Sequence, residues 1–145
     1  MYKRQRPDAL AELLHKGESH ARERGLDPDA MLAARLAPDM LTLVGQVQRA
    51  SDHAKGAAGR LAGLEPPPFA DIEQILVEAH ARISRTLDYI DTVPLQAFDQ
   101  AAERIITLPF GVPPMPAARY LYGLPPPHPF FPTPPPHATP LPPTP

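Results

Sequence analysis

The sequence predicts an all-α fold, an antiparallel four-helix bundle whose fourth helix is truncated and followed by a proline-rich extended tail. Apolar residues recur at three- and four-residue spacing through most of the chain, which is the period of an amphipathic helix. Of the 23 prolines, 12 lie in the last 21 residues, where they prevent a helix from continuing. We therefore divide the chain into a helical-bundle domain, residues 1–123, and a tail, residues 124–145, which we expect to be disordered.

The first helix is expected over residues 7–24, because Pro7 suits the first helical turn and Gly25 suits the end. Its inward stripe consists of small and apolar residues: Leu10, Leu13, Leu14, Gly17 and Ala21. A glycine in mid-helix costs about 1 kcal/mol relative to alanine. We therefore expect Gly17 to serve close packing.

Two further helices are expected in the middle of the chain. Asp27 caps a short helix before a long one over residues 38–62, which Gly63 ends. An Arg35–Asp39 contact is expected to hold these two together. The inward stripe of the long helix is Met40, Leu43, Val44, Val47, Ala50, Ala54, Ala58 and Leu61. Its alanines and glycines indicate close approach by another helix.

A third helix is expected to begin at Asp71 as its cap, after the stiff connector "EPPPF". Its apolar face is the most regular in the chain: Ile72, Ile75, Leu76, Ala79, Ile83, Leu87 and Ile90. "RIITLPF" is a short β-like run that cannot make a sheet alone. The fourth helix is expected to start at Pro116, and the prolines after Gly123 end it.

Composition excludes several classes of function. The net charge is −2 and the basic residues are scattered, which argues against a nucleic-acid partner. No stretch has the roughly 18 apolar residues of a membrane span, so no membrane association is expected and the cytoplasm is the expected compartment. Without cysteine, a metal site would need His, Asp or Glu ligands.

Three histidines lie near the inward stripes of different helices: His20, His53 and His80. They could converge at one end of the bundle, where imidazoles bind zinc, nickel or iron. Boundary positions also suit ordinary structural histidines, and no His pair at i, i+4 supports the metal interpretation. Asp52 and Lys55 are expected on the outer side of their helix, as a solvated or intrahelical pair.

The strings "ARLAPDM", "QVQRASDHAKGAAGRLAG" and "FADIEQ" resemble the bacterial family DUF1993, a domain of unknown function in the DinB/YfiT-like superfamily of four-helix bundles. The resemblance covers residues 8–122. It implies a DinB-like bundle, often a dimer. Some superfamily members bind a divalent metal through one histidine on the second helix and two on the fourth, and use it in thiol-dependent transfers or hydrolysis.

His20 and His53 match positions of the family and are the candidate metal ligands, whereas His80 does not. The chain departs from the family pattern after Tyr122, where a proline-rich segment replaces the helix that would supply further ligands. No serine-elbow motif, phosphate-binding glycine loop or catalytic carboxylate pair is present. The sequence therefore leaves enzymatic activity open and identifies no small-molecule ligand.

Two functions follow from these observations. One is a bundle with a vestigial divalent-metal or small-ligand pocket near His20 and His53. The other is a non-catalytic dimerising module for structure or interaction. Without a full fourth helix, three apolar stripes remain partly uncovered, and small domains have little stability to spare. We therefore expect a homodimer that supplies the missing face.

Overall fold

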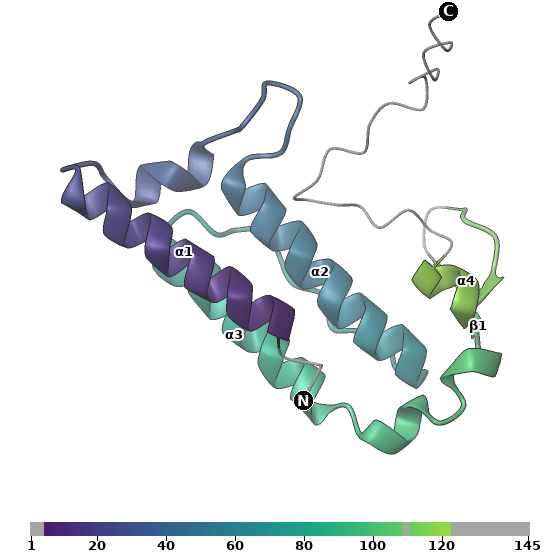
Figure 1. Ribbon diagram of the computed structural model, residues 1–145. Helices are drawn as coiled ribbons and strands as arrows, with labels where there is room; N and C mark the ends of the chain where they lie inside the picture. The colour runs from purple at the N-terminus through teal and green to yellow at the C-terminus, as the bar shows by residue number, and fades with distance from the viewer. Residues whose placement is uncertain (1–4, 109–110, 123–145) are drawn as a thin grey trace, which may run out of the picture.

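The computed structural model describes residues 5–108 and 111–122, and these form a mainly helical molecule (Figure 1). Its four α-helices are α1 (Gln5–Glu23), α2 (Leu43–Ala62), α3 (Leu76–Thr92) and α4 (Ala117–Tyr122). Three short 3-10 helices are η1 (Asp29–Ala33), η2 (Leu95–Phe98) and η3 (Ala101–Glu103). The expected tail, residues 124–145, lies outside the described residues.

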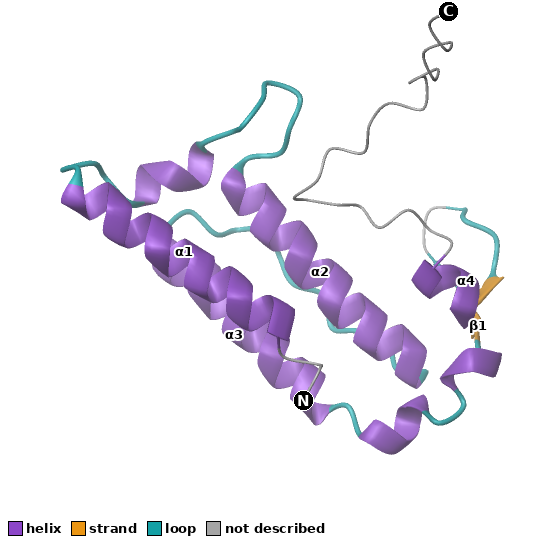
Figure 2. Ribbon diagram, in the orientation of Figure 1, coloured by secondary structure: helices purple, strands orange, loops and turns teal. Residues whose placement is uncertain are grey.

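The long helices α1, α2 and α3 lie side by side, whereas α4 sits apart, near the C-terminal end of α2 (Figure 2). Helix α3 packs along both α2 and α1, and α1 also contacts α2. The all-α prediction is confirmed. The β-like run is β1 (Ile105–Ile106), which pairs antiparallel with β2 (Met115–Pro116) just before α4.

The main core lies where α1, η1, α2 and α3 meet. Its buried members are Leu14, Leu32, Val47, Leu76, Ala79 and Ile83. A second, smaller cluster joins the end of α2 to β1 and α4 through Leu61, Ile106 and Ala117. The expected apolar face of the third helix is thus confirmed from Leu76 onward, whereas Ile72 is 71% exposed.

Helix α1 agrees with the expected range, and Gly17 allows close packing as expected. A β-carbon at Gly17 would lie 3.0 Å from Cε of Met31, a residue of η1. Leu13 belongs to the expected inward stripe, but it is 57% exposed because no described helix covers that side of α1.

Helix α2 begins later than expected, at Leu43 instead of Pro38. Thr42 is the N-cap, and its hydroxyl accepts a hydrogen bond from the backbone N–H of Gly45 at 3.2 Å. Residues 38–40 form a turn, so the expected Arg35–Asp39 contact is wrong. The Arg35 guanidinium instead donates to the backbone carbonyl of Met40, which ties this turn to the end of η1.

The expected cap of the third helix was also wrong, because α3 begins at Leu76 and Asp71 pairs with an arginine. The backbone N–H of Leu76 donates to the carboxylate of Asp29 at 2.7 Å, so η1 caps α3 from a distance in sequence. Within α3, Glu78 accepts a hydrogen bond from the N–H of Gln74 at 2.7 Å. These carboxylates satisfy amides that have no partner inside the helix.

Other predicted boundaries hold. Asp27 accepts from the backbone N–H of Asp29 at 3.0 Å, at the start of η1. Gly63 ends α2 in the left-handed conformation, with φ of 73°. Helix α4 directly follows Pro116 as expected. None of the described helices combines the length and apolar character that crossing a membrane would require.

Candidate functional site

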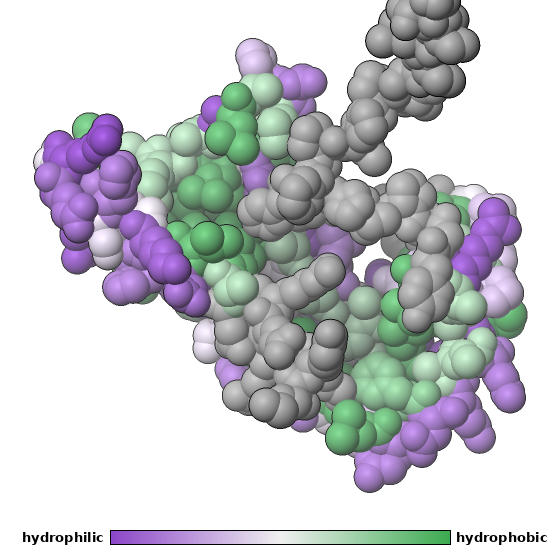
Figure 3. Space-filling view, in the orientation of Figure 1, coloured by the Kyte–Doolittle hydropathy of each residue, from purple (hydrophilic) through white to green (hydrophobic). Residues whose placement is uncertain are grey.

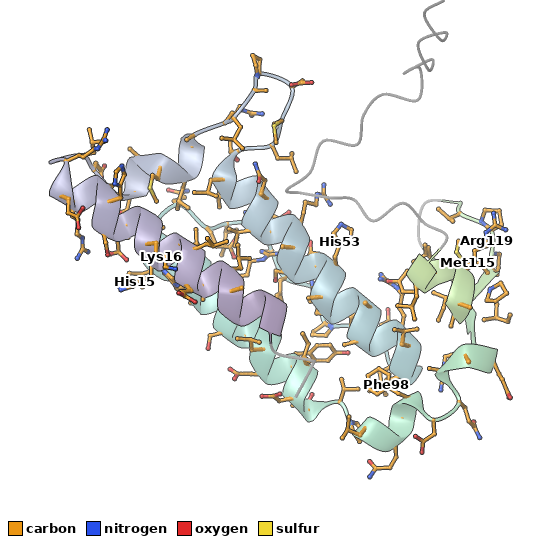
Figure 4. All side chains as sticks on the ribbon, in the orientation of Figure 1. His15, Lys16, His53, Phe98, Met115 and Arg119 are labelled. Carbon is orange, nitrogen blue, oxygen red and sulfur yellow. The ribbon has the colours of Figure 1, made fainter. Side chains whose placement is uncertain are left out.

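His53 lies on the side of α2 that faces α4, and it is exposed (Figure 4). Partial burial lowers the pKa of His53, and the charge of Arg49 lowers it further. Asp52 opposes this effect and Arg60 reinforces it. Because the net pKa lies below its ordinary value, the imidazole is neutral near pH 7, which is the form that binds metals.

The structure does not join the candidate ligands into a metal centre. His20 is exposed on α1, and His80 is half-buried on α3. Across residues 5–108 and 111–122, no group of three or more His, Asp or Glu side chains is placed so that it could hold a metal ion. The three helices therefore do not bring these histidines together with carboxylates in a ligand cage.

A network of charged residues, which the apolar periodicity of the sequence does not indicate, lies between α2 and α3. At its centre is Arg82 of α3, whose side chain is fully buried. One nitrogen, Nη2, lies 3.0 Å from carboxylate oxygens of both Asp52 and Asp71. The other, Nη1, donates to Glu73 at 3.1 Å and to the backbone carbonyl of Ala70 at 2.9 Å.

Asp52 and Lys55 take part in this network, so their expected outward position is wrong. Lys55 is buried, and its Nζ lies 2.6 Å from Asp52 within α2. The intrahelical pairing was therefore correct, but Lys55 is removed from solvent and only Asp52 remains partly exposed. The ammonium also lies 4.4 Å from the centre of the Phe69 ring, because the connector before α3 folds over this face of α2.

Glu73 is the most deeply buried carboxylate of the network, with a side chain that is 2% exposed. Burial by itself raises the pKa of Glu73. Hydrogen bonds from Gln48 and Arg82, together with the charge of Arg82, outweigh burial and hold the pKa below its usual value. Arg85 lies 3.6 Å away, so Glu73 stays ionised between several donors.

Two hydroxyls extend the polar contact between the helices. The hydroxyls of Ser51 and Thr86 are 2.5 Å apart, and Thr86 also donates to the carbonyl of Arg82 at 2.9 Å. A signal for this contact was present in the sequence, since Ser51, Lys55 and Gly59 recur at four-residue spacing. The apolar stripes alone do not indicate this contact.

The last turns of α2 present glycines against polar side chains. A β-carbon at Gly59 would lie 2.6 Å from the Tyr89 hydroxyl of α3, which confirms the expected close helix approach. A β-carbon at Gly63 would overlap the Arg104 guanidinium. Both glycines therefore leave room for a side chain to lie directly on the helix backbone.

The chemistry open to these residues depends on which of them already have charged partners. The charged groups between α2 and α3 mostly form ion pairs and hydrogen bonds with one another, so we interpret them as structural rather than reactive. His53 and the arginines on the other side of α2 face outward toward α4 and have fewer partners. The chemistry open to the described residues is therefore ligand or anion binding on that side of α2.

Comparison with known proteins places the chain in a family. The model of the DUF1993 family, a domain of unknown function, matches residues 3–133. A crystal structure of a DinB family member from Shewanella denitrificans superposes with a TM-score of 0.75 at 30% sequence identity, over 81% of this chain and 68% of that one. The search of curated proteins found no match. With its DinB-like all-α bundle, the chain belongs to the DUF1993 family.

Proposed function

We propose that this protein is a cytoplasmic, non-catalytic module that acts by forming a homodimer through the face of α2 that α4 leaves uncovered. The observation that supports this proposal is the stripe Ala50, Ala54 and Ala58, which is only half-buried although it lies along the longest helix of the bundle. Small residues at four-residue spacing let another helix approach closely.

Among the described residues, the small size of α4 explains why the stripe is left half-buried. Helix α2 has 20 residues and is about 30 Å long, whereas the six residues of α4 span about 9 Å. In addition, α4 packs mainly against β1, β2 and η3. On the face in Figure 3, hydrophobic surface gathers where α1, η1 and the start of α2 meet, and the exposed Leu13 belongs to α1. A second copy would remove this apolar surface from water.

Sedimentation equilibrium of the full chain over a range of concentrations tests the proposal. We expect a dimer, and Ala54→Glu should shift it toward monomer because a carboxylate would be buried at the interface. The matched control is Ala81→Glu, on an exposed position of α3, which should leave the dimer intact. Circular dichroism shows that both variants fold. A wild-type chain that is monomeric at every concentration contradicts the proposal.

A divalent-metal or small-ligand pocket at His53 and His20 is the second candidate. It is supported by the lowered pKa of His53, which keeps the imidazole in its metal-binding form. The nearby charges of Arg49 and Arg60 oppose the binding of a cation. Metal analysis of protein purified without a histidine tag tests this candidate: stoichiometric metal that is lost in His53→Ala supports it, and metal-free wild-type protein rejects it.

A further inference from the structure

A pocket of ≈ 530 Å³ opens at the C-terminal end of α2, outside the charged network described above. Its walls come from the last turn of α2, the connector that follows, and the segment after β1. They comprise Arg60, Leu64, Glu65, Pro66, Thr107 and Leu108. The volume is within the range of small-molecule sites, and three apolar walls with a few polar groups are typical of such sites.

Two arginines at this end of α2 lack the carboxylate partners that the chain gives to its structural arginine. Arg82 contacts three carboxylates, whereas the guanidinium of Arg60 has one hydrogen bond, to the Tyr120 hydroxyl at 3.3 Å. Nε of Arg104 is buried without a hydrogen-bond partner. Within the described part of the chain, no Asp or Glu side chain pairs with Arg60 or Arg104. Guanidinium groups offer five donors each, so most donors here are unused.

The chain positions these two cations instead of leaving them in solvent. Both side chains are half-buried. Arg60 lies over Gly56 of α2, and Arg104 lies over Gly63, the residue that ends α2. The Tyr89 hydroxyl lies near Gly59 between them and is also buried without a partner.

Arg60 lies in the last turn of α2, where the negative end of the helix dipole stabilises its positive charge. Burial lowers the pKa of His53, and the charges of Arg49 and Arg60 lower it further. The only carboxylate in the pocket wall is Glu65, and it contacts neither arginine closely enough to neutralise it. The pocket therefore combines the unused guanidinium donors of Arg60 with apolar walls.

We propose that this pocket binds a small anion that carries a carboxylate or phosphate group, with the Arg60 guanidinium as the donor. Guanidinium groups match both oxyanions with two parallel hydrogen bonds. Leu64, Pro66 and Leu108 would contact a hydrocarbon part of the ligand. This site is separate from the proposed dimer face and does not depend on it.

Titrations of the full chain with benzoate and with inorganic phosphate, monitored by two-dimensional amide NMR, test the proposal. Saturable shifts at residues 60–66 and 107–108 are expected for at least one probe, with a Kd in the millimolar range or tighter. Benzoate binding more tightly than phosphate assigns an organic carboxylate, and the reverse assigns a phosphate group. The absence of saturable shifts for both probes overturns the proposal.

Variants locate the site. Arg60→Gln should weaken binding by about tenfold or more, since it removes a charge-assisted hydrogen bond. The control is Arg24→Gln, an exposed arginine after α1, which should bind as the wild type does. Arg60 is half-buried, so a thermal melt checks folding, and Arg60→Lys provides a second variant that keeps the charge. Wild-type affinity in a folded Arg60→Gln protein contradicts the assignment.

Discussion

Replacement of Arg82 by methionine tests whether the buried charge network holds α2 and α3 together. Methionine keeps much of the apolar stem but removes the guanidinium that contacts Asp52, Asp71 and Glu73. Breaking a buried ion pair by removing one partner costs about 3–5 kcal/mol, because the other charge is left buried without compensation.

The exposure of each carboxylate decides where in this range the variant falls. Asp71 is 53% exposed and can regain water, and Asp52 is 31% exposed and keeps Lys55. Glu73 is 2% exposed and keeps only Gln48 and the more distant Arg85. The penalty therefore comes chiefly from Glu73, and we expect a loss of about 3 kcal/mol, at the lower end of the range.

The dependence of this loss on pH identifies its origin. In the wild type the pKa of Glu73 is lowered, so its contribution to stability is present above the unfolded pKa and is lost as pH falls through the folded pKa. In Arg82→Met, burial dominates and raises that pKa above the unfolded value of about 4.3. The variant then loses stability as pH rises above the unfolded pKa of Glu73, because the buried carboxyl must ionise. The difference between the two proteins should grow from pH 4 to pH 7.

Urea unfolding at pH 4 and pH 7, followed by circular dichroism, measures these quantities. The control Arg85→Met, at a side chain that is 54% exposed, should cost less than about 1 kcal/mol. Adding Glu73→Gln to Arg82→Met should recover part of the loss, because the uncompensated charge is gone. A loss below about 1 kcal/mol at pH 7, or one that is equal at both pH values, would refute this reasoning.

Three further predictions concern single positions. Gly63→Ala should cost about 1–2 kcal/mol in thermal unfolding, because φ is 73° and the new β-carbon overlaps a guanidinium; Gly25→Ala, with φ of 67° and open space, should cost less. Asp29→Ala should cost about 1 kcal/mol by removing the cap of α3, and a change within error of zero would contradict the capping role. The pKa of His53 measured by NMR should lie below the ordinary value and rise in Arg60→Gln; a wild-type pKa at or above that value would contradict the structure.

Local patterns in the sequence predicted the helices well but not all of their ends. The predicted end of α2 is correct because Gly63 adopts a conformation that other residues avoid. The predicted starts of α2 and α3 were wrong because proline and aspartate also occur in turns. The cap of α3 comes from Asp29 of η1, and a contact over 47 positions has no local signature.

The candidate site was predictable only in part. The sequence pointed to His53, and the structure places it beside two arginines on the open side of α2. The structure does not gather His20 and His53 into a three-ligand group within the described residues. Helical periodicity places each histidine on a face of its helix. It does not show how the helices are rotated and shifted relative to one another, which decides whether the side chains meet.

Sequence alone determined the helical class, the number of long helices and the family, because periodicity, glycine stops and the string "QVQRASDHAKGAAGRLAG" are local properties. Tertiary structure decided which polar residues are buried. Lys55, which was expected on the outer side of its helix, and Arg82 both lie inside because carboxylates of α2 and of the connector before α3 pair with them. Pairing between distant segments offsets the desolvation of a charge, and only the assembled fold shows where such segments meet.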